Sequence, residues 1–224
     1  MLKKQKFYFK NIKSLFWVPV VLLLIVMPVV VGALYNAMAD QESIALQNIL
    51  TIFQQIIPLF STWWLVFILR EYIDGDGAEI LYTYESVYRS KLGVVLLTLA
   101  CYLLVLAADY LLLSVLYLKW AGLIWIDFVK MSIICLFFNS FVYLIMYLLR
   151  STTAGIICSI LYYFAVSLTG QMGNPFVSVY FEYGGNQLGF VSASDLGSHY
   201  LVVLLLSFAL LALAYIRERE YRIQ

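Results

Sequence analysis

The chain has 224 residues and a formal net charge of +1, and 64% of its residues are hydrophobic while only 12% are charged. Its mean hydropathy is +0.92, and charged residues are about half as frequent as in a typical soluble domain. A soluble protein of this length could not bury so much apolar surface, so we expect an all-α integral membrane protein with no nucleic-acid partner.

The chain begins with a basic lead-in over residues 1–14, which carries five lysines. Because basic residues flank membrane spans on the cytosolic side, this lead-in predicts a cytoplasmic N-terminus. The first apolar span covers about 15–35 and is long enough to cross a bilayer. Residues 37–39 resemble a signal-peptide cleavage site. However, a signal core is about 7 to 15 residues long, so we expect a retained helix that is kinked at Pro19 and Pro28.

Five further apolar spans follow the first one. They are predicted at about 49–69, 92–118, 128–149, 152–169 and 200–216. The intervening sequence comprises a polar connection at 36–48, a polar segment at 70–91, a short connector at 119–130, a tight turn at Arg150 and a longer segment at 171–197. The last of these could form a hairpin or a partly re-entrant excursion.

The distribution of basic residues predicts the orientation of the spans. If both termini, the segment 70–91 and Arg150 face the cytosol, twelve Lys and Arg lie inside and only Lys119 and Lys130 lie outside. The positive-inside rule therefore predicts six transmembrane helices in one domain, 1–224, of the cell (plasma) membrane, with both termini cytoplasmic. The segment 171–197 is then external.

The segment 70–91 is the one long polar run between apolar spans. It holds three of the fourteen basic and five of the thirteen acidic residues, which lipid cannot solvate. Ile80, Tyr84 and Val87 recur at helical spacing. These features predict a short amphipathic helix on the cytosolic face of the membrane, entered through a turn at 75–77.

Motifs of enzyme chemistry are scarce. The sequence contains no P-loop, no G-x-S-x-G and no H-E-x-x-H. Asp74-Gly75-Asp76 has a spacing that holds a divalent metal in some sugar-nucleotide enzymes, but we expect a helix-breaking turn here. His199 is expected at the external interface, and the three cysteines are expected to be packing residues. No catalytic, cofactor or metal site is therefore predicted.

Asp109 is the one acid inside an apolar span. It lies roughly 27 Å along a helix from Lys91, which places it near the far side of a hydrocarbon core about 30 Å thick. We expect it to make an intramembrane polar contact, either at the outer interface or with a neighbouring helix. A contact with a substrate or an ion is the alternative.

The polar segment contains an acid, then Gly-x-x-Glu-x-Leu, then an Arg and a Lys that lead into the third span. The residues in this pattern are Glu71, Gly77, Glu79, Leu81, Arg89 and Lys91. The pattern, together with the six-helix topology, resembles ABC-2-type transporter permeases. The chain departs from the family in having no proline in Ser86-Val87-Tyr88-Arg89, in having Ala78 after the glycine, and in lacking an obvious pair of external helices before helix six.

The resemblance implies a permease subunit of an ATP-driven exporter that forms half of a translocation path. In the family, the segment between helices two and three is a coupling helix that binds a separate P-loop ATPase subunit. The pattern residues and Tyr84 would make that contact here, ATP and Mg would belong to the partner chain, and helices one, two and five would line the path. A second permease, identical or related, would complete it.

The expected cargo is a peptide antibiotic or another amphipathic, lipid-like molecule, because the spans offer no charged pocket. Three other functions remain open. One is a six-helix substrate-binding subunit of a vitamin importer, which the acidic coupling segment disfavours. Another is an intramembrane enzyme, which would need paired polar groups at membrane depth. The third is a structural or assembly subunit without transport.

Overall fold

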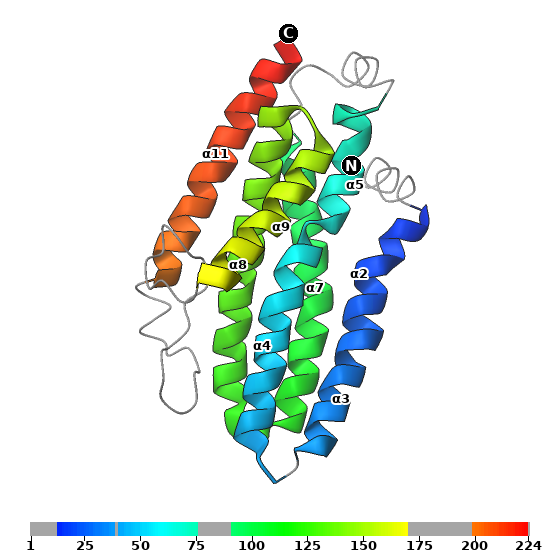
Figure 1. Cartoon of the computed structure of the whole chain (residues 1–224), viewed down its shortest axis with the longest axis vertical. Coiled ribbons are helices and arrows are strands. Elements are labelled where there is room, and N and C mark those ends of the chain that lie inside the picture. The colour runs from blue at the N-terminus through cyan, green and yellow to red at the C-terminus, as the bar shows by residue number, and fades with distance from the viewer. Residues whose placement is uncertain (1–12, 39, 76–90, 170–198, 224) are drawn as a thin grey trace.

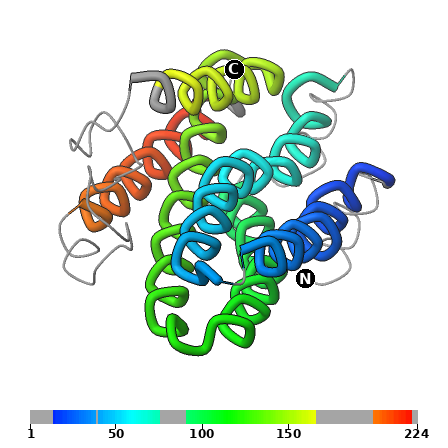
Figure 2. Tube along the Cα trace, turned by 60° about the horizontal axis from the view of Figure 1, so that its bottom comes forward, coloured from blue at the N-terminus to red at the C-terminus, as the bar shows by residue number. Residues whose placement is uncertain are grey.

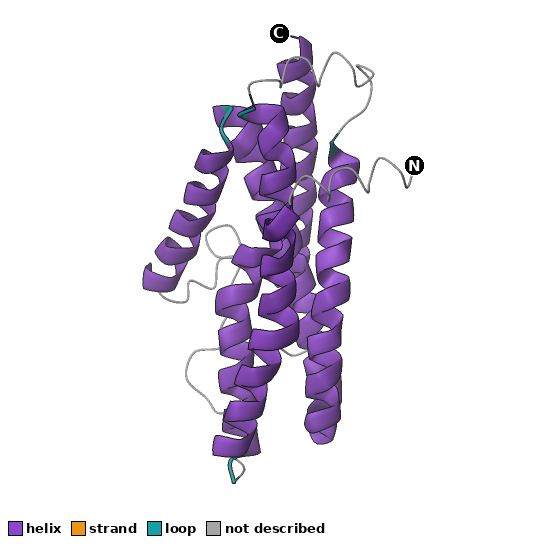
Figure 3. Ribbon diagram, turned by 90° about the vertical axis from the view of Figure 1, so that its right-hand side faces the viewer, coloured by secondary structure: helices purple, strands orange, loops and turns teal. Residues whose placement is uncertain are grey.

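A computed structural model describes residues 13–38, 40–75, 91–169 and 199–223, and all elements in these ranges are helical (Figure 3). We refer to the end at the top of Figure 1, where the C-terminus lies, as the upper end of the bundle, and to the opposite end as the lower end. The elements are η1 (Lys13–Phe16), α2 (Trp17–Val21), η2 (Leu22–Val26), α3 (Met27–Ala37), α4 (Glu42–Ser61), α5 (Trp63–Ile73), α7 (Leu92–Leu116), η3 (Leu118–Trp120), α8 (Ala121–Leu149), α9 (Thr152–Thr169) and α11 (Leu201–Ile223).

Five helical stretches in the described part of the chain are long and apolar enough to cross a membrane, which confirms the predicted all-α fold class. They cover Ser14–Ala37, Glu42–Ile73, Leu92–Leu116, Leu118–Leu149 and Leu201–Glu220, and α9 is a shorter apolar helix. The chain is therefore treated as a multipass membrane protein. Six spans and a coupling helix stay predictions, since residues 76–90 and the segment 171–197, which is predicted to be external, lie outside the described residues.

Helix α8 is the central element. It packs against α4, α5, α7, α9 and α11, whereas the first helical stretch packs against α4 and α7 on one side of the bundle (Figure 2). Because α8 has neighbours on several sides, apolar side chains occur all round it, among them the buried Ile134, Phe138 and Tyr143. The remaining helices therefore take their positions from α8.

The first helical stretch is continuous but changes its winding in the middle. A π-helical turn, η2, lies between Pro19 and Pro28, and α-helix flanks it on both sides. Proline has no N–H to donate to the helical ladder, and π turns are one way for a helix to absorb such an interruption. The predicted irregularity at the two prolines is thus a widened turn inside one helix.

Two indoles hold the start of the first helix. The Nε1–H groups of Trp63 and Trp64 donate to the carbonyl oxygens of Leu15 and Phe16, each at 3.0 Å. The rings of Phe16 and Trp64 are also stacked, with centroids 5.1 Å apart. These contacts connect the first helix to the start of α5.

The second span begins at Glu42 rather than near residue 49, and it breaks into α4 and α5 at Thr62. Pro58 cannot donate a backbone hydrogen bond, which weakens the helix just before the break. The Ser61 hydroxyl donates to the Pro58 carbonyl at 2.7 Å, and the Thr62 hydroxyl donates to the Leu59 carbonyl at 2.9 Å. Side-chain hydroxyls thus donate to backbone carbonyl oxygens where the helical hydrogen-bond pattern is interrupted.

Neighbouring helices brace this break. Asn139 of α8 donates its Nδ2–H to the Ser61 hydroxyl at 3.0 Å, and Tyr102 of α7 donates its O–H to the Ile57 carbonyl at 2.8 Å. All four residues are buried. The bend between α4 and α5 is therefore held by hydrogen bonds in the middle of the bundle.

Two other boundaries complete the fold. Helix α8 begins at Ala121, so Asp127 and Lys130 lie inside a helix rather than in the predicted connector 119–130. Between α8 and α9, Arg150 has a left-handed backbone with φ of 51°. That conformation ends α8 and reverses the chain, which confirms the tight turn predicted at this residue.

A glycine at the crossing of α8 and α9 gives a test of this packing. A Cβ at Gly155 would lie 2.6 Å from Cγ of Met146, whereas a Cβ at Gly122 meets nothing within 4 Å. We expect Gly155→Val to lower the Tm in detergent by about 5 °C through overpacking, and Gly122→Val to change it far less. Equal Tm values for the two variants, measured by intrinsic fluorescence, would contradict close α8–α9 packing.

Candidate functional site

The two ends of the polar segment 70–91 meet at the upper end of the bundle. Helix α5 ends there at Ile73 and α7 begins there at Leu92, beside the α8–α9 turn and the last turns of α11 (Figure 1). The structure describes the segment up to Gly75 and again from Lys91. Both described ends make contacts with helices that come later in the chain.

Asp74, directly after α5, caps the start of α9. The backbone N–H of Thr152 lies 3.3 Å from Oδ1 and 3.2 Å from Oδ2 of Asp74, and the Thr152 hydroxyl also donates to Oδ2. The first N–H groups of a helix have no partner within the helix, and a carboxylate there also interacts favourably with the helix dipole. Asp74 therefore stabilises the start of α9 and ties α5 to it.

Glu218 of α11 caps the start of α7 in the same manner. The backbone N–H of Lys91 lies 2.9 Å from Oε1 and 3.2 Å from Oε2 of Glu218, and the Tyr143 hydroxyl of α8 also donates to Oε2. Glu218 is buried, with only 1% of its surface exposed. One carboxylate thus joins α7, α8 and α11.

The side chain of Lys91 adds a contact with α5. Its Nζ lies 3.6 Å from the centroid of the Tyr72 ring, and the residue is only 2% exposed. A desolvated cation over an aromatic ring is stabilised by about 2 kcal/mol. The ring of Tyr72 thus compensates the buried charge of Lys91, and hydrogen bonds from Lys91 N–H and the Tyr143 hydroxyl compensate that of Glu218.

We name these residues the anchor cluster. Its members are Tyr72, Asp74, Lys91, Tyr143, Thr152 and Glu218. Through this cluster the first described end of the polar segment is fixed to α9 and the second to α11.

The predicted coupling residues divide into two groups. Glu71 is exposed near the end of α5, whereas Lys91 is buried in the anchor cluster, so the Lys91 side chain is not part of the accessible surface. The other predicted coupling residues lie outside the described residues; they are Gly77, Glu79, Leu81, Tyr84 and Arg89. The ATPase contact predicted for this set stays a prediction.

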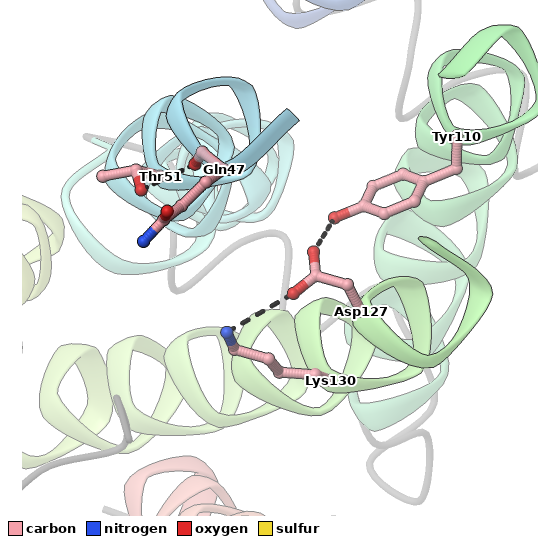
Figure 4. Close-up of polar contacts among 5 residues, drawn as sticks. All are labelled: Gln47, Thr51, Tyr110, Asp127 and Lys130. Carbon is pink, nitrogen blue, oxygen red and sulfur yellow. Dashed lines mark hydrogen bonds and ion pairs between the residues drawn. The ribbon is translucent and has the colours of Figure 1, made fainter. Parts of the chain in front are cut away.

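A second polar group lies near the lower end, between α7 and α8 (Figure 4). The Tyr110 hydroxyl donates to Oδ2 of Asp127 at 2.7 Å, and Nζ of Lys130 lies 3.4 Å from Oδ1 of Asp127. All three residues are buried. Figure 4 also shows that on α4 the Thr51 hydroxyl makes a local hydrogen bond to the Gln47 carbonyl, at 2.8 Å.

Asp109, beside Tyr110, is also buried, at 2% exposure. Its Oδ2 atom has no hydrogen-bond partner among the described residues. Burying a carboxyl oxygen without a hydrogen-bond partner is unfavourable, so the Oδ2 atom of Asp109 does not stabilise α7. The polar contact predicted for Asp109 therefore stays a prediction.

Two apolar surfaces face each other between the second span and α9. They enclose a groove of about 160 Å³. Its lining comprises Leu59, Phe60, Thr62, Trp63, Val66 and Phe67 from the second span and Ile156, Ser159 and Ile160 from α9. The groove lies beside the break at Thr62, at the place where the second span changes direction.

Metal binding finds no support in the described part of the chain. No group of three or more His, Cys, Asp or Glu there could hold a metal ion. Asp74, half of the Asp-x-Asp motif, binds Thr152 instead, while Asp76 lies outside the described residues. What the described polar clusters can do is hold helices together.

Sequence reasoning missed Glu218 and the pair Asp127–Lys130. A signal for Glu218 was present, because Leu211, Ala214 and Glu218 recur at i, i+3 and i+7 and all three are buried. A tail described only as charged thus continues the buried face of α11. For Asp127 and Lys130 the i, i+3 spacing of opposite charges was the signal.

The anchor cluster can be tested with two neighbouring glutamates of α11. Glu218→Gln should lower the Tm in detergent by about 5 °C, because an amide offers one acceptor oxygen where the carboxylate offers two, and it lacks the negative charge that favours a helix start. Glu220, exposed and 2.7 Å from Arg217, makes only a surface ion pair. Glu220→Gln is therefore the control, and its Tm should match that of the unmodified chain. Equal destabilisation in both variants would refute the capping role.

The buried pair can be tested by a double-mutant cycle. Asp127→Leu alone leaves the Lys130 charge buried, and Lys130→Met alone leaves the Asp127 charge, so each should destabilise by about 3–5 kcal/mol. The double variant removes both charges and should recover most of this loss. Unfolding in detergent followed by circular dichroism measures all four corners, and additive losses would show that the two residues do not interact.

No family model, no curated protein and no solved structure matches the chain. What the protein does is therefore inferred from its own residues and their geometry.

Proposed function

We propose that this chain is the membrane-spanning permease subunit of an ATP-driven exporter of the ABC-2 type. Two such subunits would form the translocation path, and a separate P-loop ATPase would bind the segment 70–91. The observation that carries the proposal is the anchoring of both ends of this segment, through Asp74 to α9 and through Lys91 to α11.

Energy for transport would enter through a protein contact. The sequence contains no P-loop, so nucleotide hydrolysis would take place in the partner. The segment between α5 and α7 is the most highly charged run between apolar spans, and the positive-inside rule places it in the cytosol. A force applied to it would act on Asp74 and Lys91 first.

The anchor cluster would pass this force on to α9 and α11. Helix starts that are capped by a carboxylate from another helix cannot separate without exposing unpaired N–H groups. A movement of Asp74 therefore carries α9 with it, and a movement of Lys91 carries α11. These contacts would convert motion of a bound ATPase into motion of apolar helices.

The groove beside Thr62 supports a path next to the second and fifth apolar helices. It lies between the α4–α5 break and α9, and its lining is almost entirely apolar. The hydrogen-bonded break at Ser61 and Thr62 is a natural place for α5 to pivot. An apolar, bending wall favours a lipid-like molecule or an amphipathic peptide as the cargo.

An intramembrane enzyme is the second candidate. Tyr110, Asp127 and Lys130 place polar groups together at one depth of the bundle, which such an enzyme would need. However, one carboxylate oxygen of Asp127 accepts from Tyr110 and the other faces Lys130. The three side chains satisfy one another, so a role in helix packing accounts for them.

The experiment is affinity purification of the chain from native membranes in a mild detergent, with identification of the proteins that co-elute in stoichiometric amounts. The parallel sample carries Glu79→Lys and Tyr84→Ala in the polar segment. A control sample carries Glu220→Lys, a charge reversal at an exposed residue of α11. We expect a P-loop ATPase to accompany the unmodified chain and the control, and to be reduced at least about tenfold with the double variant, since both a charge and an aromatic contact are lost.

Three results would contradict the proposal. One is the absence of any ATPase from the purified unmodified chain. Another is equal recovery of the ATPase with all three chains, which would place the contact elsewhere. A third is hydrolysis of a peptide or lipid by the purified chain that is abolished by Asp127→Asn, which would favour the intramembrane enzyme.

A further inference from the structure

The face of α5 that lines the groove carries a charged residue one turn further toward the upper end. On α5, Trp63, Val66 and Phe67 line the groove, and Arg70 follows at i+7 from Trp63, on the same helix face. Arg70 is exposed. An apolar surface thus ends in a guanidinium group on one side of one helix.

No hydrogen bond or ion pair of the Arg70 side chain occurs within the part of the chain that the structure describes. Asp74, one turn further along the same face, accepts hydrogen bonds from Thr152 and makes no ion pair with Arg70. An exposed guanidinium without a partner is a strong binding group for phosphate, since it offers several N–H donors in one plane.

The depth of the groove matches one leaflet of a bilayer. Trp63 is the first residue of α5 and Ile73 is the last, so the groove lies roughly 15 Å below the upper end of that helix. Half of a hydrocarbon core is also about 15 Å. Arg70, near the end of α5, then lies at the level of the lipid headgroups.

We propose that the groove binds one acyl chain of an anionic phospholipid whose phosphate pairs with Arg70. In a membrane, acyl chains are the apolar chains that surround this surface. The volume of about 160 Å³ and the apolar lining suit part of one acyl chain rather than a helix of a partner protein. With the orientation predicted by the positive-inside rule, this lipid belongs to the cytosolic leaflet, where anionic headgroups attract basic residues.

This inference does not depend on the proposed transport function. It requires only that the described helices lie in a bilayer. A permease, an enzyme and an assembly subunit could all carry such a lipid site, so failure of one proposal leaves the other standing.

Trp63 provides a local probe, because it lines the groove and bromine atoms on an acyl chain quench indole fluorescence on contact. The intact chain is reconstituted in phosphatidylcholine vesicles that contain a small fraction of phosphatidylglycerol brominated on its acyl chains. A parallel set contains the same fraction of brominated phosphatidylcholine. The signal of Trp63 is the difference in fluorescence between the chain and its Trp63→Phe variant, measured in both sets.

We expect brominated phosphatidylglycerol to quench the Trp63 signal at about tenfold lower mole fraction than brominated phosphatidylcholine, in keeping with one charge-assisted pair. Arg70→Gln should abolish this preference. Arg219→Gln, which removes another exposed arginine near the same end of the bundle, should preserve it. Ser159→Leu, which fills the groove from α9, should reduce quenching by both lipids.

Two outcomes would overturn the inference. One is equal quenching by the two brominated lipids in the unmodified chain. The other is a preference for phosphatidylglycerol that persists in Arg70→Gln or disappears equally in Arg219→Gln, which would indicate general attraction of anionic lipid to basic residues. Circular dichroism of each reconstituted variant verifies that its helical content is unchanged.

Discussion

The upper end of the bundle depends on the carboxylate of Glu218, which lies on α11 and caps the start of α7. It satisfies the backbone N–H of Lys91, accepts from Tyr143 and brings its negative charge into the cluster that buries the Lys91 cation. A buried carboxylate is tolerated only when hydrogen bonds and an opposite charge compensate its lost hydration. Here the hydrogen bonds come from two other helices, α7 and α8, so the acid of α11 requires both of them to be in place.

The other polar contacts follow the same principle at different depths. Asp74 caps α9 near the upper end, Asn139 and Tyr102 brace the bend in the middle, and Tyr110 of α7 donates to Asp127 of α8 near the lower end. Each contact joins or supports helices that lipid would otherwise separate at little cost, since apolar faces pack equally well against lipid tails. Helix α8 takes part in the contacts at all three depths, which fits its central position.

Apolar length and composition predicted the helical fold class, and the turn at Arg150 followed from one charge between two spans. Helix ends were less predictable. Glu42 is the first residue of α4, where the helix dipole favours an acid, and Asp127 lies inside α8 because Tyr110 and Lys130 compensate its burial. The burial of Glu218 was hidden in a tail that reads as charged. Its buried face emerges only when the i, i+3, i+7 spacing is followed past the apolar part of α11. Contacts between residues so far apart in the chain follow from tertiary structure, which local pattern does not determine.

The long sequence separation of the two caps has a consequence for biosynthesis. Asp74 and Thr152 are 78 residues apart, and Lys91 and Glu218 are 127 residues apart. At translation rates of about 5–20 residues per second, the start of α7 waits on the order of ten seconds for its cap. During that interval water, lipid headgroups or the membrane-insertion machinery must hydrogen-bond to its N–H groups. Helix α11 thus completes an end of the bundle that was begun long before it.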